Sequence, residues 1–354
     1  MAERKKRHWL SRLSFGSVAF TVSVLLFLGY LSVIVDPAKA WFFTLFGLLY
    51  PVVFPIAAIL FIWALMRRSH TRGLLLAALL PSLLFFGRFY QFKGPSEEAE
   101  PTLKVVSYNV GVFAHGHLKD RLALADSTAR YLRTLDADII CLQEFWLPNS
   151  ESPDKWIRKH FPGYGFEYYV YTGKSGRLGN LTLSRLPLVG KGKNTFEHST
   201  NLALYTDVGL PSGVLRLYNC HFESYNISVA GLVKKDGAVE EAEAKMKRSI
   251  TERPRQVAEV LRGMDAAPMH SIALGDFNDT PLSYTYTRLH RGRRDSFVQA
   301  GKGFGATYST LWPLLRIDYI LCPPELEAVS YKVDKVPYSD HYPVIAEYHE
   351  RHSE

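Results

Sequence analysis

The sequence predicts a layered α/β sandwich, two packed mixed β-sheets flanked by helices, preceded by an N-terminal bundle of about three transmembrane helices. The first observation is that residues 1–93 contain three long apolar runs, as membrane helices require. The second is that short apolar strands alternate with amphipathic helices from Leu103 onward. The third is that several neighbouring strands are joined by gaps of hairpin length. Such gaps favour mixed sheets over a doubly wound parallel sheet.

The three apolar runs predict transmembrane helices at about residues 15–35, 41–66 and 73–92. The first run has 21 consecutive uncharged residues, enough to cross a hydrocarbon core of roughly 30 Å. The second is interrupted only by Pro51 and Pro55, which membrane helices tolerate. The third reaches residue 92 only if Arg88 extends to the lipid headgroups, and a buried or interfacial helix is its alternative.

The distribution of basic residues predicts the orientation of these helices. Five Lys/Arg residues precede the first run, and Arg67, Arg68 and Arg72 lie between the second and third, whereas the loop between the first two carries only Lys39. The positive-inside rule then places the N-terminus in the cytoplasm and everything after residue 95 outside it. We therefore expect an integral membrane protein with an extracytoplasmic soluble domain, periplasmic or on the cell surface in a bacterium. A cleaved signal peptide, the alternative for the first run, would leave this side unchanged.

A polar segment bounded by prolines, residues 94–101, is typical of a linker and precedes a domain at about residues 102–350. Strands are expected in this domain at residues 103–108, 139–143, 178–184, 202–208, 214–221, 271–275, 317–321 and 344–348. Helices are expected at residues 121–135, 155–160 and 240–264. Its three cysteines each lie in or beside an apolar run, which predicts buried free thiols and excludes a disulfide framework.

The net charge of +8 does not by itself indicate a nucleic-acid-binding surface. Residues 1–100 contain 11 Lys/Arg and 5 Asp/Glu, whereas the remaining 254 residues contain 31 and 29. The basic excess therefore lies mostly in the apolar N-terminal part, and the soluble domain is nearly neutral. A dedicated polynucleotide nuclease would be expected to carry a basic track.

Polar side chains of catalytic type cluster at the ends of the expected strands, where a rigid scaffold presents functional groups. These strand-end residues are Asn109, Glu144, His221, Asp276, Asn278, Asp318, Asp340 and His341. The oxygens of Asn109, Glu144 and Asp340 are ligands that suit Mg²⁺. A carboxylate or imidazole that activates water, and amide or imidazole donors that stabilise developing charge, complete the requirements of phosphate-ester hydrolysis.

Each strand-end residue also has a structural alternative. Asn109 could close a turn, His221 could be a buried structural histidine, and the Asp276–Asp279 segment could cap a helix or form an Asx turn. Glu144 ends a buried strand, where an unpaired carboxylate would be costly, so a metal partner explains it better. Because all of them follow apolar strands, we favour the joint catalytic interpretation.

The motifs GDFND and SDHYPV, in this order and separated by RIDYIL, resemble those of the endonuclease/exonuclease/phosphatase superfamily. The resemblance extends from about Leu103 to Tyr348 and implies an Mg²⁺-dependent hydrolase, with Mn²⁺ as a substitute. It implies a metal site of Asn109, Glu144 and Asp340, in which Glu144 is the principal ligand.

The resemblance also implies catalytic roles for the other strand-end residues. Asp276 is similar to the residue that aligns or activates the attacking water. Asn278 and His221 are similar to residues that contact the phosphate, and His221 is also assigned to catalysis. Asp318 resembles the carboxylate that orients the catalytic imidazole of His341.

The substrate stays open between two classes at this stage. The inositol-phosphatase signatures WxGDxNxR and PAWCDRIL are absent, and the corresponding strings are ALGDFNDTP and LLRIDYIL. We predict a membrane-anchored phosphodiesterase of nuclease type, with a sphingomyelinase-like or other phospholipid head-group hydrolase as the alternative. A catalytically silent binding module is the second alternative, although such a protein would be expected to have lost Glu144, Asp276 or His341. The lipid bilayer is the expected partner, and no protein partner is inferred.

Overall fold

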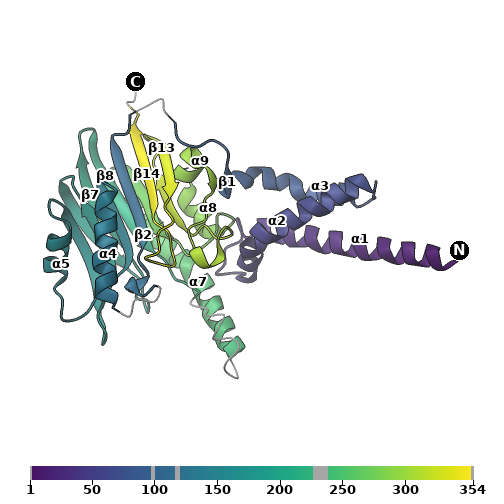
Figure 1. The fold of residues 1–354 in the computed structure, drawn as a ribbon, viewed down its shortest axis with the longest axis horizontal. Coiled ribbons are helices and arrows are strands. Elements are labelled where there is room, and N and C mark those ends of the chain that lie inside the picture. The colour runs from purple at the N-terminus through teal and green to yellow at the C-terminus, as the bar shows by residue number, and fades with distance from the viewer. Residues whose placement is uncertain (1, 97–99, 116–119, 226–237, 352–354) are drawn as a thin grey trace.

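The computed structural model describes residues 2–96, 100–115, 120–225 and 238–351, and these form a helical region followed by a β-sandwich (Figure 1). Residues 97–99 of the expected linker and residues 226–237 of the domain lie outside the described residues. The described part of the linker is held to the domain, because Ser96 donates a main-chain hydrogen bond of 2.8 Å to Val329.

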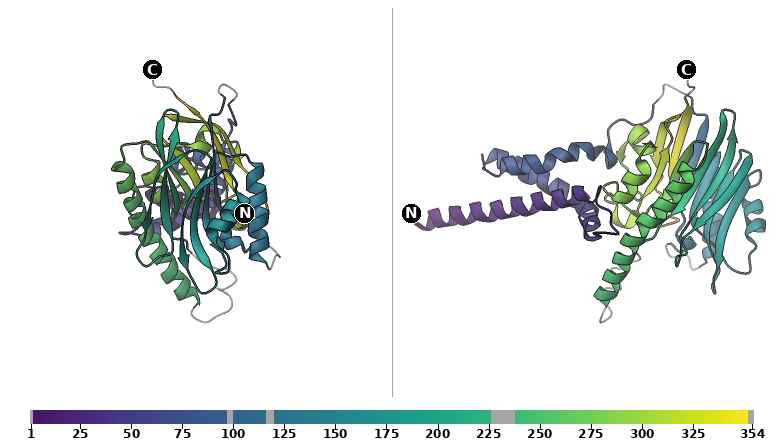
Figure 2. Two further views of the ribbon diagram at one scale, coloured as in Figure 1. Left: turned by 90° about the vertical axis from the view of Figure 1, so that its left-hand side faces the viewer. Right: turned by 180° about the vertical axis from the view of Figure 1, so that it is seen from behind.

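The helical region contains α1 (Ala2–Leu31), α2 (Phe42–Met66) and α3 (Arg72–Leu79), which lie side by side and extend away from the sandwich (Figures 1 and 2). Within the described residues, two segments are long and apolar enough to cross a membrane, Ser14–Leu31 and α2. This criterion rests on length and composition alone.

The predicted third transmembrane helix is wrong as a continuous helix. After eight residues α3 gives way to the 3₁₀ helices η1 (Leu80–Leu84) and η2 (Phe86–Arg88). Pro81 lies at the first turn of η1, and a proline cannot donate the main-chain hydrogen bond that a continuing α-helix needs. The guanidinium of Arg88 is directed to the soluble domain, since it donates to the carbonyl oxygen of Pro281 at 3.2 Å.

The predicted α/β sandwich is confirmed as two six-stranded mixed sheets. The first has the order β13-β14-β2-β3-β5-β4, with β2 (Leu103–Asn109), β3 (Ile139–Leu147), β4 (Gly165–Thr172), β5 (Arg177–Ser184), β13 (Leu326–Val333) and β14 (Val344–Glu350). The second has the order β10-β12-β9-β8-β7-β6, with β6 (Leu188–Thr195), β7 (Leu202–Leu210), β8 (Gly213–His221), β9 (Ser271–Asp276), β10 (Arg294–Asp295) and β12 (Asp318–Cys322). Only one pair in each sheet is parallel, β2 with β3 and β8 with β9.

The apolar core lies between the two sheets, where alternate side chains such as Val105, Leu217 and Ile320 are fully buried. Two helices, α4 (Arg121–Thr134) and α5 (Pro153–His160), cover the outer face of the first sheet, and α7 (Ala238–Asp265) and α8 (Tyr284–His290) cover the second. The three cysteines are buried and free, as predicted.

Candidate active site

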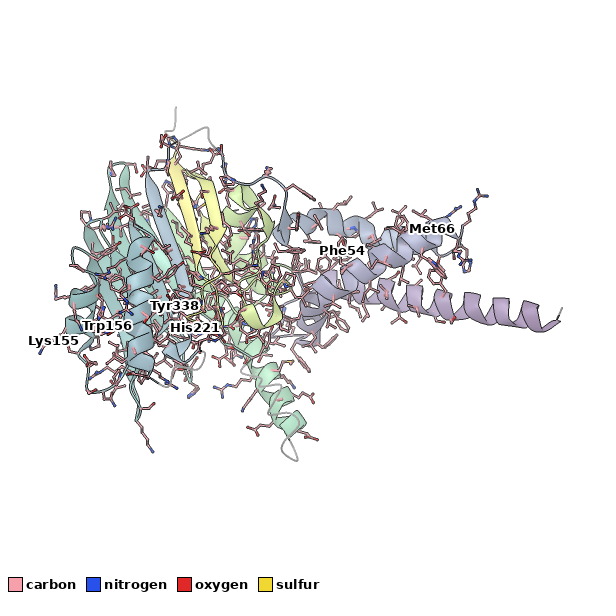
Figure 3. All side chains as sticks on the ribbon, in the orientation of Figure 1. Phe54, Met66, Lys155, Trp156, His221 and Tyr338 are labelled. Atoms are coloured by element: carbon pink, nitrogen blue, oxygen red, sulfur yellow. The ribbon has the colours of Figure 1, made fainter. Side chains whose placement is uncertain are left out.

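The topology brings all eight strand-end residues to one edge of the sandwich. Strands β2, β8 and β9 end there, and β12 and β14 begin there. β3, which was expected to end before Glu144, instead bulges at this edge and continues to Leu147. The residues meet across both sheets because the two layers pack face to face. His221, labelled in Figure 3, marks the position of this cluster at the lower edge of the sandwich in that view.

Asp276 is the buried centre of the cluster, with 1% of its surface exposed. Its Oδ2 atom accepts a hydrogen bond of 2.9 Å from Asn109 Nδ2, and its Oδ1 atom accepts one of 2.8 Å from the main chain of Asn278. Burial raises the pKa of Asp276 to about 6, although the nearby imidazole of His341 opposes the rise. A carboxyl group that exchanges its proton near neutral pH suits the activation of water.

Asp318 and His341 form a dyad beside Asp276. His341 Nδ1 lies 2.9 Å from Asp318 Oδ2, and His341 Nε2 lies 3.8 Å from Asp276 Oδ2. Burial disfavours the imidazolium form of His341, but the carboxylates of Asp318 and Asp276 outweigh it and hold the pKa of His341 well above its usual value. The raised pKa favours the protonated imidazole, in which both ring nitrogens are donors.

Glu144 projects into the site from a β-bulge. The pairing of β3 with β5 shifts register between Leu142 and Phe145, and Glu144 has a left-handed φ of 50°. Bulges redirect a side chain next to active sites, and here the carboxylate meets Asn109 Nδ2 at 3.2 Å and His221 Nε2 at 3.5 Å. About a quarter of the Glu144 side chain, 28%, is exposed, so its oxygens are accessible to a ligand.

The residues predicted to hold a metal fit a hard divalent cation. Glu144 and Asp340 supply carboxylate oxygens, and the Ser339 hydroxyl donates to the Asn109 carbonyl oxygen at 2.8 Å and lies 3.3 Å from Asp340 Oδ1. The amide of Asn109 turns its Nδ2 atom toward Glu144, whereas its Oδ1 atom accepts from the main chain of Gly111 at 3.0 Å, so ligation by Asn109 requires rotation of the amide. Asp276, Asp318 and His341 also place three ligand atoms within 4.8 Å of one another. In that group, His341 Nδ1 and Asp318 Oδ2 already bond to each other, although Asp318 Oδ1 is buried without a hydrogen-bond partner within the described residues. The Glu144 carboxylate is the more exposed, so we favour the Glu144 end.

The two residues predicted to contact the phosphate, His221 and Asn278, differ in whether their donor atoms already have hydrogen-bond partners. The buried Nε2 atom of His221 has no hydrogen-bond partner within the described residues, although Glu144 Oε1 lies 3.5 Å and Asp276 Oδ2 3.9 Å away. Both amide hydrogens of Asn278 are already used, one by the Phe222 carbonyl oxygen at 2.9 Å and one by Asp276 Oδ2 at 3.1 Å. Contact between Asn278 and a phosphate therefore requires a change of partner.

A buried network of side-chain amides lies next to the site. The sequence analysis did not identify it. Gln143 Nε2 donates to Asn219 Oδ1 at 2.7 Å, and Asn219 Nδ2 donates to the Leu181 carbonyl oxygen at 3.0 Å. These contacts link the two sheets one residue before Glu144 and two before His221. In the sequence, this network is indicated only by the polar residues inside the apolar runs IICLQEF and LRLYNCH.

Gly275 allows β8 and β9 to approach closely directly before Asp276. Its φ is +122°, and a Cβ atom there would lie 2.9 Å from the main-chain nitrogen of Cys220 and closer still to its carbonyl oxygen. Only glycine fits this position, so the register that sets His221 beside Asp276 depends on it.

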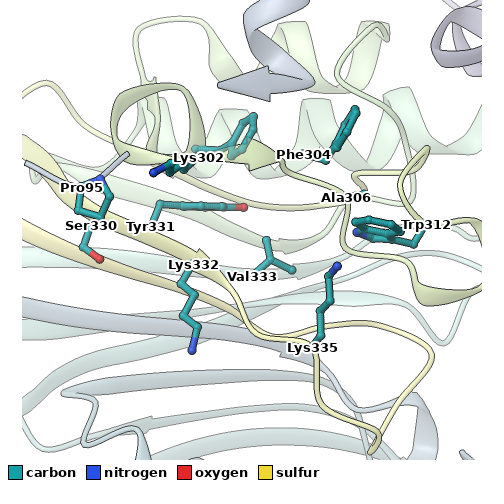
Figure 4. Close-up of a pocket in the computed structure, with 11 residues that line it drawn as sticks. Pro95, Lys302, Phe304, Ala306, Trp312, Ser330, Tyr331, Lys332, Val333 and Lys335 are labelled. Carbon is teal, nitrogen blue, oxygen red and sulfur yellow. The ribbon is translucent and has the colours of Figure 1, made fainter. Parts of the chain in front are cut away.

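A cavity of about 490 Å³ lies elsewhere on the domain and shares no residue with the strand-end cluster (Figure 4). It is lined by Lys302, Lys335, Phe304, Trp312 and Tyr331 among others, and Lys335 Nζ lies 3.5 Å from the ring centre of Trp312. The structure gives it no link to the proposed chemistry.

Comparison with known proteins gives two family matches. The model described as the Endonuclease/Exonuclease/phosphatase family matches residues 106–341, a span that contains every strand-end residue. A domain of unknown function (DUF8431) matches residues 11–89. A search of curated proteins gave no match.

Several solved structures share the fold. An endonuclease/exonuclease/phosphatase from Beutenbergia cavernae has a TM-score of 0.52 at 17% identity, with 71% of this chain and 72% of that chain covered. A family protein from Leptotrichia buccalis has a TM-score of 0.50 at 17% identity, covering 70% and 100%. The human Nocturnin catalytic domain with bound sulfate has a TM-score of 0.53 at 15% identity, covering 71% and 96%. At such identities the likeness concerns the fold alone.

Proposed function

This chain belongs to the endonuclease/exonuclease/phosphatase family, and from that premise we propose that it is a membrane-anchored, Mg²⁺-dependent phosphodiesterase. The observation that carries the proposal is the buried Asp276 carboxyl group, placed between Asn109 and the Asp318–His341 dyad. This arrangement combines a base, a charged imidazole donor and an oxygen-rich metal end in one site.

The environments of Asp276 and His341 assign them opposite roles. With a pKa of about 6, Asp276 is mostly a carboxylate at neutral pH and accepts a proton from the attacking water. His341, whose pKa is raised, stays protonated and donates to the phosphate oxygens as negative charge develops. Asp318 holds the tautomer and orientation of that imidazole. Two groups whose pKa values are shifted by their surroundings divide the acid and base work.

Glu144, Asn109 and Asp340 are the residues that would hold a divalent cation. When bound, such an ion polarises a phosphoryl oxygen and stabilises the leaving oxygen. His221 lies between this end and Asp276, with Nε2 3.9 Å from Asp276 Oδ2, and it binds the substrate phosphate.

Membrane anchoring is supported by the course of the helical region. The domain contacts the end of the region where α1 meets α2, because Ser32 donates to the Leu282 carbonyl oxygen. Met66 lies farther from the sandwich than Phe54, so α2 runs away from the domain (Figure 3). Residues 72–88 must therefore return to the domain beside α2, and their α and 3₁₀ turns give a length of roughly 30 Å.

This return path supports an extracytoplasmic domain. If α1 and α2 cross the bilayer, residues 72–88 cross the same thickness, although they form no continuous α-helix. The basic residues 67, 68 and 72 then lie on the cytoplasmic side, with the N-terminus, and the domain on the opposite side.

The candidate substrates are nucleic acid and a phospholipid head group. One contact supports a phospholipid head group as the substrate: Leu282 is buried among apolar residues of the helical region. Asn278 is only four residues away, or at most about 14 Å of extended chain. The phosphate-binding side of the site is thus tied to the membrane-proximal side of the domain.

The function is tested with the full chain in nanodiscs, stripped with EDTA and then supplied with Mg²⁺. Substrates are single-stranded DNA, RNA, phosphatidylcholine, sphingomyelin and bis(p-nitrophenyl) phosphate. We expect Mg²⁺-dependent release of product from at least one diester. No hydrolysis of any substrate, together with unchanged binding of one of them, would support the silent binding module instead.

A further inference from the structure

A loop that adjoins the active site packs against the helical region. The 277–283 loop connects β9, which ends at Asp276, to α8. Leu282 in this loop is completely buried, and it belongs to the same apolar cluster as Leu26, Tyr50 and Val53 of the helices. Ser32 Oγ donates a hydrogen bond of 2.7 Å to the Leu282 carbonyl oxygen. A catalytic loop and the N-terminal helices thus share one packed core.

Two glycines make room for this contact. A Cβ atom at Gly29 would lie 3.7 Å from Leu282 Cδ2 and 3.2 Å from the Phe46 carbonyl oxygen. A Cβ atom at Gly47 would lie 2.9 Å from Ser32 Cβ and closer still to the carbonyl oxygen of Leu282. The helix backbones therefore approach the loop directly, with no side chain between them at Gly47.

Arg88 makes a second contact between the helical region and the loop. Its guanidinium donates to the Pro281 carbonyl oxygen at 3.2 Å, and it lies 5.0 Å from the ring centres of Phe85 and Tyr286. Phe85 belongs to the helical region and Tyr286 to α8, so the charged group stacks between the two parts of the chain.

The opposite side of the loop is fixed to the sandwich. Asp279 forms a buried ion pair of 2.9 Å with Arg253 of α7, and its carbonyl oxygen lies 2.8 Å from the Tyr319 hydroxyl. The segment from Asp279 to Leu282 is therefore held at both ends. Only Thr280 and Pro281 separate Leu282 from the anchored Asp279, and Asn278, with a left-handed φ of 52°, directly precedes Asp279. A shift of Leu282 therefore strains this short segment beside the site.

We propose that the helical region positions the active site through Leu282, so that it regulates the geometry of Asp276 and Asn278 besides anchoring the protein. Leu282 is a positioning residue, since its side chain is buried among the apolar residues of the helical region and it lies four residues after Asn278. The catalytic part of this inference rests on the proposed phosphodiesterase function. The structural part, coupling between helices and loop, does not.

The test compares Gly47→Ala with Gly73→Ala in the full chain in nanodiscs. Both replace a helix glycine of the same region, but a Cβ atom at Gly73 meets no atom within 4 Å. The Cβ atom of Gly47→Ala would lie too close to the Leu282 carbonyl oxygen and to Ser32, so the contact between helix and loop must shift. A displacement of about 1 Å at a reacting group lowers rates by about 10-fold or more. We expect this loss in kcat for bis(p-nitrophenyl) phosphate, a soluble substrate, and none for Gly73→Ala.

Hydrogen exchange gives a readout that does not require activity. Amides in residues 276–283 should exchange faster in Gly47→Ala than in the wild type, whereas those of α4 should not change. Leu282→Ala should reproduce both effects, and Leu282→Met, which conserves volume, should restore most of the rate. These variants keep the test decisive if Gly47→Ala fails to fold.

The outcomes separate this inference from the proposed function. An active wild type, with wild-type kcat and exchange in Gly47→Ala and Leu282→Ala, overturns the inference and leaves the function standing. Faster exchange without loss of kcat also overturns it, because the loop would then move without consequence. An inactive wild type overturns the function, and the exchange data still decide whether helices and loop are coupled.

Discussion

His341 and Asp318 come from different β-sheets, and their side chains meet with 2.9 Å between imidazole Nδ1 and carboxylate Oδ2. Asp318 opens β12 in one sheet, and His341 lies three residues before Val344, the first residue of β14 in the other. The dyad therefore exists only when the two sheets have packed. It makes the integrity of the sandwich a condition for catalysis.

The dyad predicts strongly non-additive mutations. His341→Ala should lower kcat by about 10²–10⁴-fold, the usual contribution of a general acid or base. Asp318→Asn should lose much of the same activity, and the double variant should be little worse than His341→Ala alone, because both act on one imidazole. Steady-state kinetics of the three variants, with thermal melts as a folding control, measure this. A double-mutant loss equal to the product of the single losses would refute the dyad.

The two shifted pKa values predict a bell-shaped pH profile at saturating Mg²⁺. Asp276 must be a carboxylate, so kcat/KM should fall about tenfold per pH unit below pH 6, where the group is protonated. His341 must be protonated, so activity should also fall at alkaline pH, above its raised pKa. His341→Ala should lose the alkaline limb and keep the acid limb. If this variant instead loses the acid limb, the roles of the two residues are reversed.

The metal site predicts a change in metal requirement rather than in folding. EDTA should abolish hydrolysis, and Mg²⁺ or Mn²⁺ should restore it. Glu144→Gln keeps the shape of the side chain but removes its charge, so the Mg²⁺ concentration for half-maximal activity should rise. Glu347→Gln is a matched control, since Glu347 has similar exposure but pairs with Lys104 on β2. Full activity in EDTA would exclude a metal role for Glu144 and Asn109.

The Asp279–Arg253 ion pair predicts a large loss of stability. Both side chains are almost fully buried, so Asp279→Asn leaves the Arg253 charge without its partner and should cost about 3–5 kcal/mol. Glu252→Gln, which breaks an exposed pair with Arg255 on the same helix, should cost less than about 1 kcal/mol. Denaturant unfolding of the full chain in detergent compares the two. Equal losses in the free energy of unfolding would mean that the buried pair stabilises the protein no more than the exposed pair.

The orientation is tested with a phosphatase reporter that is active only outside the cytoplasm. A fusion after Gly94 should be active and one after Arg68 inactive, because residues 72–88 lead back to the domain. If the reporter is inactive in both fusions, the domain lies in the cytoplasm and only two segments cross the membrane.

The sequence by itself determined the central strands and the residues at their ends. β9 is buried on both faces, and its sequence SIALGD is a mainly apolar run that ends in one charged residue. β2 is similar in burial, although Lys104 and Ser107 interrupt its apolar residues. The edge strands β4, β6, β10 and β13 were not predicted. β6 alternates half-buried and exposed residues and contains two glycines, because a strand at a sheet edge has less to bury.

Only the tertiary structure decided how the side chains are used. The bulge that turns Glu144 into the site depends on pairing with β5, the dyad on the packing of two sheets, and the occupied amide of Asn278 on its contact with Phe222. The hydrogen bond between Ser32 and the Leu282 carbonyl oxygen joins residues 250 positions apart in the chain. Local sequence records burial and strand ends because these follow from neighbouring residues. Contacts between distant segments depend on backbone geometry that neither segment specifies alone.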